Sequence, residues 1–229
     1  KGPIYDYPII STNLKYLKQI RKYLIKLKIN KYKIILEPLK KNTAPAVLSA
    51  ALINDIPKEQ PMIFFPADHL IEKVNLFNKI IIKKKKYLTD QNIFIFGIKP
   101  SSPSSEYGYF LTKKINNNIN KVKKFIEKPN KYKAKKIIKN KGYWNSGMFF
   151  FRKDSIINNY KKYQPAIFKN CSKSFTSANI KNDVYYLKKF FFKKISNKSF
   201  DYAILEKIKD IYGIKLDIPW SDLGSWKEI

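Results

Sequence analysis

Two aspartates stand where a ligand-binding carboxylate is expected, shortly after an apolar run. Asp68 follows the run 62–65, and Asp222 lies in a polar loop after the run 213–218. In open parallel sheets, ligands bind at the carboxyl ends of the strands. Mg²⁺ needs only one or two carboxylates and completes its shell with water and substrate phosphate. The pair therefore predicts a magnesium site for phosphoryl chemistry, although an aspartate after a strand can also be a simple helix cap.

A carboxylate and an ammonium close another strand-like stretch, 122–127, as Glu127-Lys128-Pro129. Glu127 could accept hydrogen bonds from sugar hydroxyls, and Lys128 could meet a phosphate as a compact cation. The proline disfavours helical angles at Lys128 and predicts an extended conformation there. A surface ion pair remains the alternative interpretation.

Polar residues interrupt the aromatic run 144–151 as Asn145-Ser146-Gly147. Glycine inside a strand often marks the close approach of a ligand, although a simple bulge is as common. His69 is the only histidine of the chain. One histidine makes neither a metal cluster nor a triad, so we assign it no catalytic role.

The order of the predicted elements indicates an α/β fold with a largely parallel sheet in the first half and antiparallel additions in the second. Asn42, Thr43 and Pro45 form a capped start for the second helix. The helices are expected at 13–29, 44–53, 74–87, 132–138 and 199–209. The strands are expected at 34–36, 62–65, 93–98, 107–111, 122–127, 144–151 and 213–218. No repeat or linker divides the 229 residues, which predicts a single domain.

The formal net charge of +30 would ordinarily point to nucleic acid. However, only Arg21 and Arg152 are arginines, and the lysines are scattered among many Ile, Asn, Tyr and Phe residues. An A- and T-rich genome explains this composition more simply, so we expect no nucleic-acid partner. Cys171 is the only cysteine, and neither a leader nor a run of ~20 apolar residues is visible, which predicts a cytoplasmic protein without a membrane partner.

Several segments, taken in order, resemble the sugar nucleotidyltransferase family, and most closely its mannose-1-phosphate guanylyltransferase branch. Two of them, Asn-Thr-Ala-Pro at 42–45 and Trp-Ser-Asp-Leu-Gly-Ser-Trp at 220–226, are specific to that branch. The others are the stretches 35–38, 66–69, 96–100, 107–109, 125–129, 144–149 and 201–207. The resemblance implies a three-layer, Rossmann-like, mostly parallel mixed sheet. It also implies the formation of GDP-mannose and pyrophosphate from mannose 1-phosphate and GTP by in-line attack, with Mg²⁺ as the cofactor and a homodimer as a possible assembly.

The resemblance also implies roles for matching positions. Asp68 and Asp222 would hold Mg²⁺ and, with Lys128, form the catalytic set. Glu127 and Lys128 would grip the sugar and its phosphate. The guanine would lie by Asn42, Thr43, Ala44 and Pro45. The sugar would be met by Gly108, Asn145, Ser146 and Gly147.

The sequence departs from the family in four places. The family opens with a strand and a Gly-rich loop that bears an Arg and a Lys, and this sequence begins after them; it ends just after Trp226. We therefore expect residues 1–229 to form an incomplete nucleotidyltransferase domain with little transferase activity of its own. Lys41 replaces an Arg, and Glu106 replaces a Gly near the sugar site.

Three alternatives stay open: a sister transferase for another sugar 1-phosphate, a non-catalytic or decayed nucleotide-sugar-binding fragment, and a basic nucleic-acid-binding protein. The sequence does not say whether the loop is encoded upstream or whether an isomerase domain follows.

Overall fold

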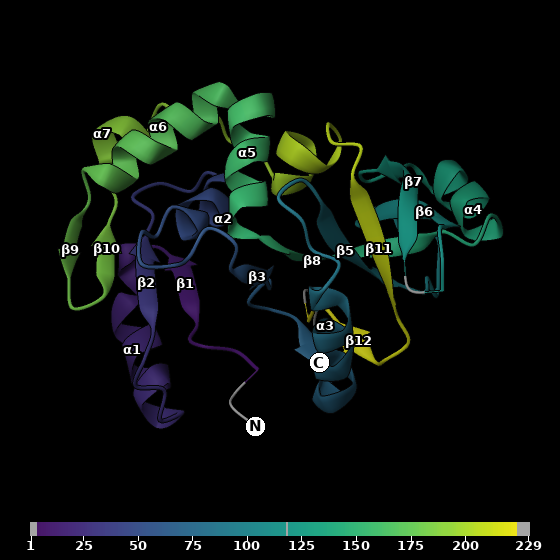
Figure 1. Cartoon of the computed structure of the whole chain (residues 1–229), viewed down its shortest axis with the longest axis horizontal. Coiled ribbons are helices and arrows are strands. Elements are labelled where there is room, and N and C mark those ends of the chain that lie inside the picture. The colour runs from purple at the N-terminus through teal and green to yellow at the C-terminus, as the bar shows by residue number, and fades with distance from the viewer. Residues whose placement is uncertain (1–3, 118, 224–229) are drawn as a thin grey trace. The chain divides into compact units, whose positions relative to one another are not determined.

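The computed structural model describes residues 4–117 and 119–223, and these fold into two compact units (Figure 1). Unit 1 comprises Lys1–Pro57 and Ile157–Ile204, and unit 2 comprises Lys58–Ile156 and Leu205–Ile229. The boundary after residue 156 falls inside helix α5 (Lys153–Tyr163). Each unit has a sheet of its own.

Unit 1 is built on a four-stranded sheet in the order β1-β2-β10-β9. Its strands are β1 (Ile9–Thr12), β2 (Lys33–Leu36), β9 (Asn179–Lys181) and β10 (Val184–Tyr186). Strands β1 and β10 run parallel to β2, and β9 pairs antiparallel with β10. Its helices and helical turns are η1 (Leu14–Tyr16), α1 (Leu17–Lys26), α2 (Thr43–Ala51), α6 (Pro165–Thr176), α7 (Lys189–Phe192) and the π-helical turn η2 (Asp201–Leu205).

One face of this sheet packs against α1, because Leu24 of the helix meets Ile34, Leu36 and Val184 of the strands. Helix α2 begins as the sequence predicts, with Asn42 as the residue that caps it. Its apolar residues are almost all buried, which explains why an alanine-rich segment of modest length forms a stable helix.

Unit 2 is built on a six-stranded mixed sheet in the order β3-β8-β5-β11-β7-β6, in which β8 also pairs with β6. Its strands are β3 (Pro61–Phe64), β5 (Ile93–Ile98), β6 (Gly108–Lys114), β7 (Asn120–Ile126), β8 (Tyr143–Arg152) and β11 (Ile211–Leu216). A short antiparallel pair, β4 (Leu70–Ile71) with β12 (Trp220–Ser221), lies outside it. Its helices are α3 (Val74–Lys85) and α4 (Lys131–Lys139), in addition to the first residues of α5.

The core of unit 2 is centred on β5, all six residues of which are buried. A strand that is covered on both faces consists of a continuous run of apolar residues, and this pattern is what predicts β5 in the sequence. Phe94 and Phe96 belong to one cluster with Phe77 of α3 and Ile137 of α4. Both helices therefore cover the same face of the sheet.

The α/β class and the mixed sheet are confirmed, but the balance of strand directions differs from the mostly parallel sheet that we expected. In unit 2 only β5 and β11 pair in parallel, because β8 lies antiparallel between β3 and β5. The expected helix 199–209 is reduced to the single turn η2. The sequence patterns also missed β1, β4, β9, β10, β12, α5, α6 and α7.

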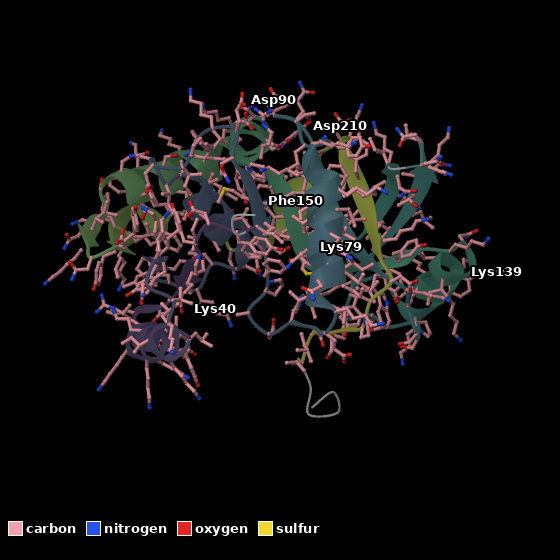
Figure 2. The ribbon with its side chains drawn as sticks, turned by 60° about the horizontal axis from the view of Figure 1, so that its bottom comes forward. Lys40, Lys79, Asp90, Lys139, Phe150 and Asp210 are labelled. Carbon is pink, nitrogen blue, oxygen red and sulfur yellow. The ribbon has the colours of Figure 1, made fainter. Side chains whose placement is uncertain are left out.

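The lysines are spread over many elements, as their scatter in the sequence predicts. Figure 2 labels Lys40 after β2, Lys79 on α3 and Lys139 on α4, and all three are exposed. Of the helices in the described residues, none is both long and apolar enough to cross a bilayer.

We predict that Phe96→Ala lowers the free energy of unfolding by about 3–5 kcal/mol, because the ring is fully buried and its removal leaves a cavity. The measurement is urea denaturation followed by tryptophan fluorescence. Ile115→Ala is the control, since Ile115 is 55% exposed and its truncation is expected to cost only about 0.5 kcal/mol. Equal losses in the two variants would contradict the packing described above.

Candidate functional site

Three of the predicted site residues meet at the start of β6. Gly108 pairs with Asn145 of β8, so these two backbones lie side by side. A Cβ at Gly108 would collide with Glu127 Oε2 and would lie 3.5 Å from the Cβ of Asn145. The carboxylate of Glu127 therefore occupies the space that a side chain at position 108 would fill.

The segment 145–147 forms an irregularity in β8 rather than a regular stretch of strand. The register of β8 against β5 shifts between Ile95 and Gly97 of β5. Gly147 has a φ of 73°, which a side chain rarely adopts, and its N–H donates to Asn145 Oδ1 at 3.4 Å. Ser146 Oγ accepts from the N–H of Met148 at 3.3 Å. The segment is thus both a bulge and a place where polar groups interrupt the strand.

The two predicted metal ligands belong to one neighbourhood centred on His69. Strands β12 and β4 are antiparallel, and Ser221 of β12 pairs with Leu70 of β4. Asp222 and His69 are the next residues on the two strands and therefore lie close to each other. Burial lowers the pKa of His69, while the charges of Asp68 and Asp222 both act to raise it. Asp68 Oδ1 lies 3.9 Å from His69 Nε2, and its side chain is 66% exposed. Both carboxylates are therefore within electrostatic reach of the same imidazole.

Aromatic residues hold the side chains around His69 in place through hydrogen bonds and ring packing. Trp220 donates its indole N–H to His69 Nδ1 at 3.3 Å, which leaves the proton of the neutral imidazole on Nε2. Tyr107 donates its hydroxyl to Asp222 Oδ2 at 3.0 Å and packs on Trp144 with ring centroids 4.7 Å apart. A Cβ at Gly147 would lie 3.8 Å from His69 Cε1. These contacts connect the aspartates to the irregular segment of β8 and to the start of β6.

Lys128 does not adopt the extended conformation that the following proline predicts. Its φ is 42°, in the left-handed region, while Pro129 is buried. Because the turn from β7 into α4 buries the proline ring, the backbone of Lys128 adopts this unfavourable positive φ. Its side chain is left exposed beside Glu127. Backbone angles of this kind typically cost about 1–3 kcal/mol and concentrate at functional sites.

In unit 1 the segment 42–45 is held in place by several hydrogen bonds. Asn42 has φ 65° and ψ −170°, a conformation that residues other than glycine rarely adopt. Thr43 Oγ1 accepts from the N–H of Phe200 at 2.8 Å, and the N–H of Ala44 donates to Lys198 O at 3.2 Å. Asn42 is exposed and Thr43 half-buried, whereas Ala44 and Pro45 are buried. Ala44 and Pro45 therefore anchor the segment in the core. Asn42 and Thr43 form the part of it that is accessible to a ligand.

Two nearby residues contribute to this part of the site although the sequence analysis gave them no role. Tyr160 is fully buried and donates its hydroxyl to Ala44 O at 2.7 Å. Glu37 follows β2 and accepts from Ser11 Oγ at 2.6 Å. Burial raises the pKa of Glu37 to about 7, against the Ser11 hydrogen bond, which lowers it. Glu37 follows a buried strand, as Asp68 follows β3. This position after a strand is the feature of the sequence by which Glu37 could have been identified.

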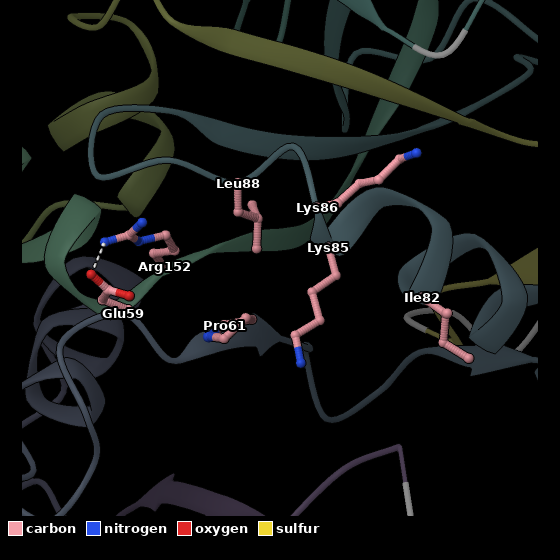
Figure 3. Close-up of a pocket in the computed structure, with 7 residues that line it drawn as sticks. All are labelled: Glu59, Pro61, Ile82, Lys85, Lys86, Leu88 and Arg152. Atoms are coloured by element: carbon pink, nitrogen blue, oxygen red, sulfur yellow. Dashed lines mark ion pairs between the residues drawn. The ribbon is translucent and has the colours of Figure 1, made fainter. Parts of the chain in front are cut away.

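A surface pocket of about 410 Å³ in unit 2 contains none of these residues (Figure 3). It is lined by Glu59, Pro61, Ile82, Lys85, Lys86, Leu88 and Arg152. An ion pair of 3.5 Å joins Arg152 and Glu59 across it. Because none of the predicted site residues lines it, we do not regard this pocket as the site.

We predict that Glu37→Gln stabilises the protein at high pH but not at low pH. The folded-state pKa of about 7 lies above the ordinary value of 4.5, so the stability that protonation provides is fully present below pH ~4.5 and is lost as the pH rises through ~7. A difference of that size corresponds to about 3 kcal/mol. Melting temperatures from pH 4 to pH 8 test this. The matched control is Glu59→Gln, whose side chain is 81% exposed, and parallel curves for wild type and Glu37→Gln would contradict the prediction.

Comparison with known proteins gives curated relatives, several of them named mannose-1-phosphate guanylyltransferase. A protein from Escherichia coli named mannose-1-phosphate guanylyltransferase is 37% identical over 205 residues, which is 86% of this chain and 44% of that protein. The chain thus spans less than half the length of this curated relative.

Solved structures agree with this likeness. A structure from Helicobacter pylori named mannose-6-phosphate isomerase has a TM-score of 0.86 and 30% identity, over 95% of this chain and 85% of that one. A structure from Thermus thermophilus named mannose-1-phosphate geranyltransferase has a TM-score of 0.82 over 96% of this chain and 62% of that one, and its 21% identity supports the fold alone. A family model described as nucleotidyl transferase matches residues 5–229. The chain belongs to the nucleotidyl transferase family.

Proposed function

We propose that this chain is the nucleotidyltransferase part of an enzyme that forms GDP-mannose and pyrophosphate from GTP and mannose 1-phosphate. The single observation that carries the proposal is the meeting of Gly108, Glu127 and Asn145, where a missing side chain leaves room for a carboxylate. The relative named mannose-1-phosphate guanylyltransferase supports the choice of sugar and nucleotide.

Unit 2 holds the sugar phosphate in this proposal. Glu127 accepts hydrogen bonds from sugar hydroxyls, and Gly108 lets the ring approach the backbone of β6. Asn145 offers an amide whose donor and acceptor both suit hydroxyl groups. Lys128, exposed beside Glu127, meets the phosphate as a compact cation. Together these groups orient the phosphate oxygen for in-line attack on the α-phosphorus of the nucleotide.

Asp68 and Asp222 are the residues that would hold Mg²⁺. The donor set suits this ion, which prefers one or two carboxylates and keeps several waters. No cluster of three or more possible ligands occurs in residues 4–117 and 119–223, and such a sparse set fits magnesium better than zinc. When bound, Mg²⁺ would neutralise phosphate charge. The hydroxyl of Tyr107 keeps Asp222 in place.

Unit 1 holds the nucleotide base in this proposal. The strained backbone at Asn42 and the hydrogen bonds to Thr43 and Ala44 keep the segment 42–45 in one conformation. A rigid segment loses little entropy when a flat base lies against it. The main alternative within the same class is transfer to another sugar 1-phosphate, because the contacts in unit 2 are hydroxyl contacts that many sugars could make.

We predict that Gly108→Ala weakens mannose 1-phosphate binding at least about tenfold while leaving the fold intact, because the new Cβ must displace the Glu127 carboxylate. Glu127→Gln should weaken it as well, and Glu59→Gln should not. Isothermal titration of each variant measures this. If Gly108→Ala binds as wild type does, the sugar does not lie at this position.

The proposed function itself is tested by substrate choice. Titration of the full chain with GDP-mannose and with UDP-glucose, both with Mg²⁺, should give binding of the first only. Any transferase activity should release pyrophosphate from GTP with mannose 1-phosphate but not with glucose 1-phosphate. A preference for UDP-glucose would favour a sister transferase, and a folded protein that binds neither would favour a decayed fragment.

A further inference from the structure

We propose that Tyr107 is a positioning residue that couples the binding of the sugar phosphate to the binding of the metal ion. It directly precedes Gly108, and its hydroxyl holds Asp222, one of the two carboxylates proposed for Mg²⁺. This inference rests on the proposed function, which places the sugar at Gly108 and the ion at Asp68 and Asp222. It goes beyond that proposal, because it makes one side chain responsible for the dependence of each binding event on the other.

The backbone of Tyr107 lies at the edge of the proposed sugar site. Gly108 is the first residue of β6 and pairs with Asn145 of β8, and the next residue, Tyr109, pairs with Trp144. Strand β8 therefore fixes the chain immediately after Tyr107. A sugar that lies against Gly108 is one residue away from Tyr107, so its binding also orders the segment from which the phenol ring projects.

The side chain of Tyr107 connects the six-stranded sheet to strand β12, which lies outside that sheet. Its ring packs on Trp144 of β8 with centroids 4.7 Å apart, and it meets Trp220 of β12 edge-on at 6.0 Å. Its hydroxyl donates to Asp222 Oδ2 at 3.0 Å. The ring thus contacts both the sheet that carries the sugar site and the strand that leads to the carboxylate.

The short pair of β4 and β12 needs such contacts to stay in place. Each of these strands has only two residues, and a two-stranded ribbon is marginally stable at best without further packing. The hydrogen bond from Trp220 to His69 joins the pair within itself and does not attach it to the sheet. A hydrogen bond to a carboxylate is stronger than a neutral one and more directional than ring packing. The Tyr107 hydroxyl is therefore the contact that orients Asp222 relative to the sheet.

A residue shared by two sites makes their binding events interdependent. When the sugar orders the segment 107–109, the phenol holds Asp222 in the orientation that its hydrogen bond selects. The ion then finds a carboxylate that has less conformational freedom to lose. By linkage, the ion must raise the affinity for the sugar phosphate by the same factor. The ion also attracts the phosphate directly, and this part of the coupling does not require Tyr107.

The test is isothermal titration of the full chain with mannose 1-phosphate, without metal and with Mn²⁺, which like Mg²⁺ prefers oxygen ligands. We expect Mn²⁺ to raise the affinity of wild type about tenfold, within the usual range for coupled sites. In Tyr107→Phe this factor should fall to about threefold or less, because outer contacts of a metal ligand typically matter by about tenfold or more.

The affinity without metal separates positioning from a merely structural role. Tyr107→Phe keeps the ring, so its affinity for mannose 1-phosphate without Mn²⁺ should stay within about twofold of wild type, whereas damage to the fold would weaken binding in both conditions. The matched control is Tyr212→Phe, the same substitution on a half-buried tyrosine of β11 whose ring packs on Phe94 with centroids 5.4 Å apart. It should keep the full effect of Mn²⁺.

Asp222→Asn shows whether Tyr107 acts through this carboxylate. Adding Tyr107→Phe to Asp222→Asn should reduce the effect of Mn²⁺ no further, because both substitutions remove the same interaction. A further reduction, or a full effect of Mn²⁺ in Tyr107→Phe alone, overturns the inference and leaves the proposed function standing. If folded wild type binds mannose 1-phosphate without any response to Mn²⁺, the inference and the metal site are wrong. If it binds no mannose 1-phosphate at all, the proposed function is wrong as well.

Discussion

Strand β8 is the element on which the arrangement of unit 2 depends, because it pairs with β3, β5 and β6 at once. Such a strand has little freedom to move, since each neighbour fixes its register. The irregular segment 145–147 is therefore carried on a rigid support. This rigidity places Asn145 against Gly108 of β6 and brings Gly147 towards His69.

The sequence predicted best those elements whose burial is uniform or strictly periodic. Strand β5 was found with its bounds, because all six residues are buried, and α3 and α4 were found from their spacing. Strands β9 and β10 were missed, because three residues carry no pattern; β10 pairs with β2, 150 residues earlier in the chain, and β9 pairs with β10. The conformation of Lys128 could not be predicted either, because it results from the burial of Pro129 in the folded turn.

The candidate site also has features that the local sequence predicts and features that only the folded chain determines. Asp68, Asp222 and Glu127 were identified by their position after apolar runs, which depends on local sequence alone. Glu37 satisfies the same rule, but its raised pKa results from burial and could be recognised only in the folded chain. Asp68 remains largely exposed, which suits a ligand for a hydrated cation, whereas Glu37 is half-buried and accepts a hydrogen bond from Ser11. Carboxylates at equivalent positions after a strand therefore differ in their chemistry because their surroundings differ.

The glycines bear on whether the site geometry is still required. Only seven occur in 229 residues, and lysines with positive φ, Lys28 and Lys141, follow helices where glycine is usually favoured. Lysine therefore stands at two positions where glycine would be less strained. Of the five glycines in residues 4–117 and 119–223, four would suffer a collision if a Cβ were added, and the fifth, Gly147, has a positive φ. At Gly108 the main collision would be with the Glu127 carboxylate. A side chain at position 108 would have to displace that carboxylate, so the sugar site proposed for unit 2 requires a glycine there.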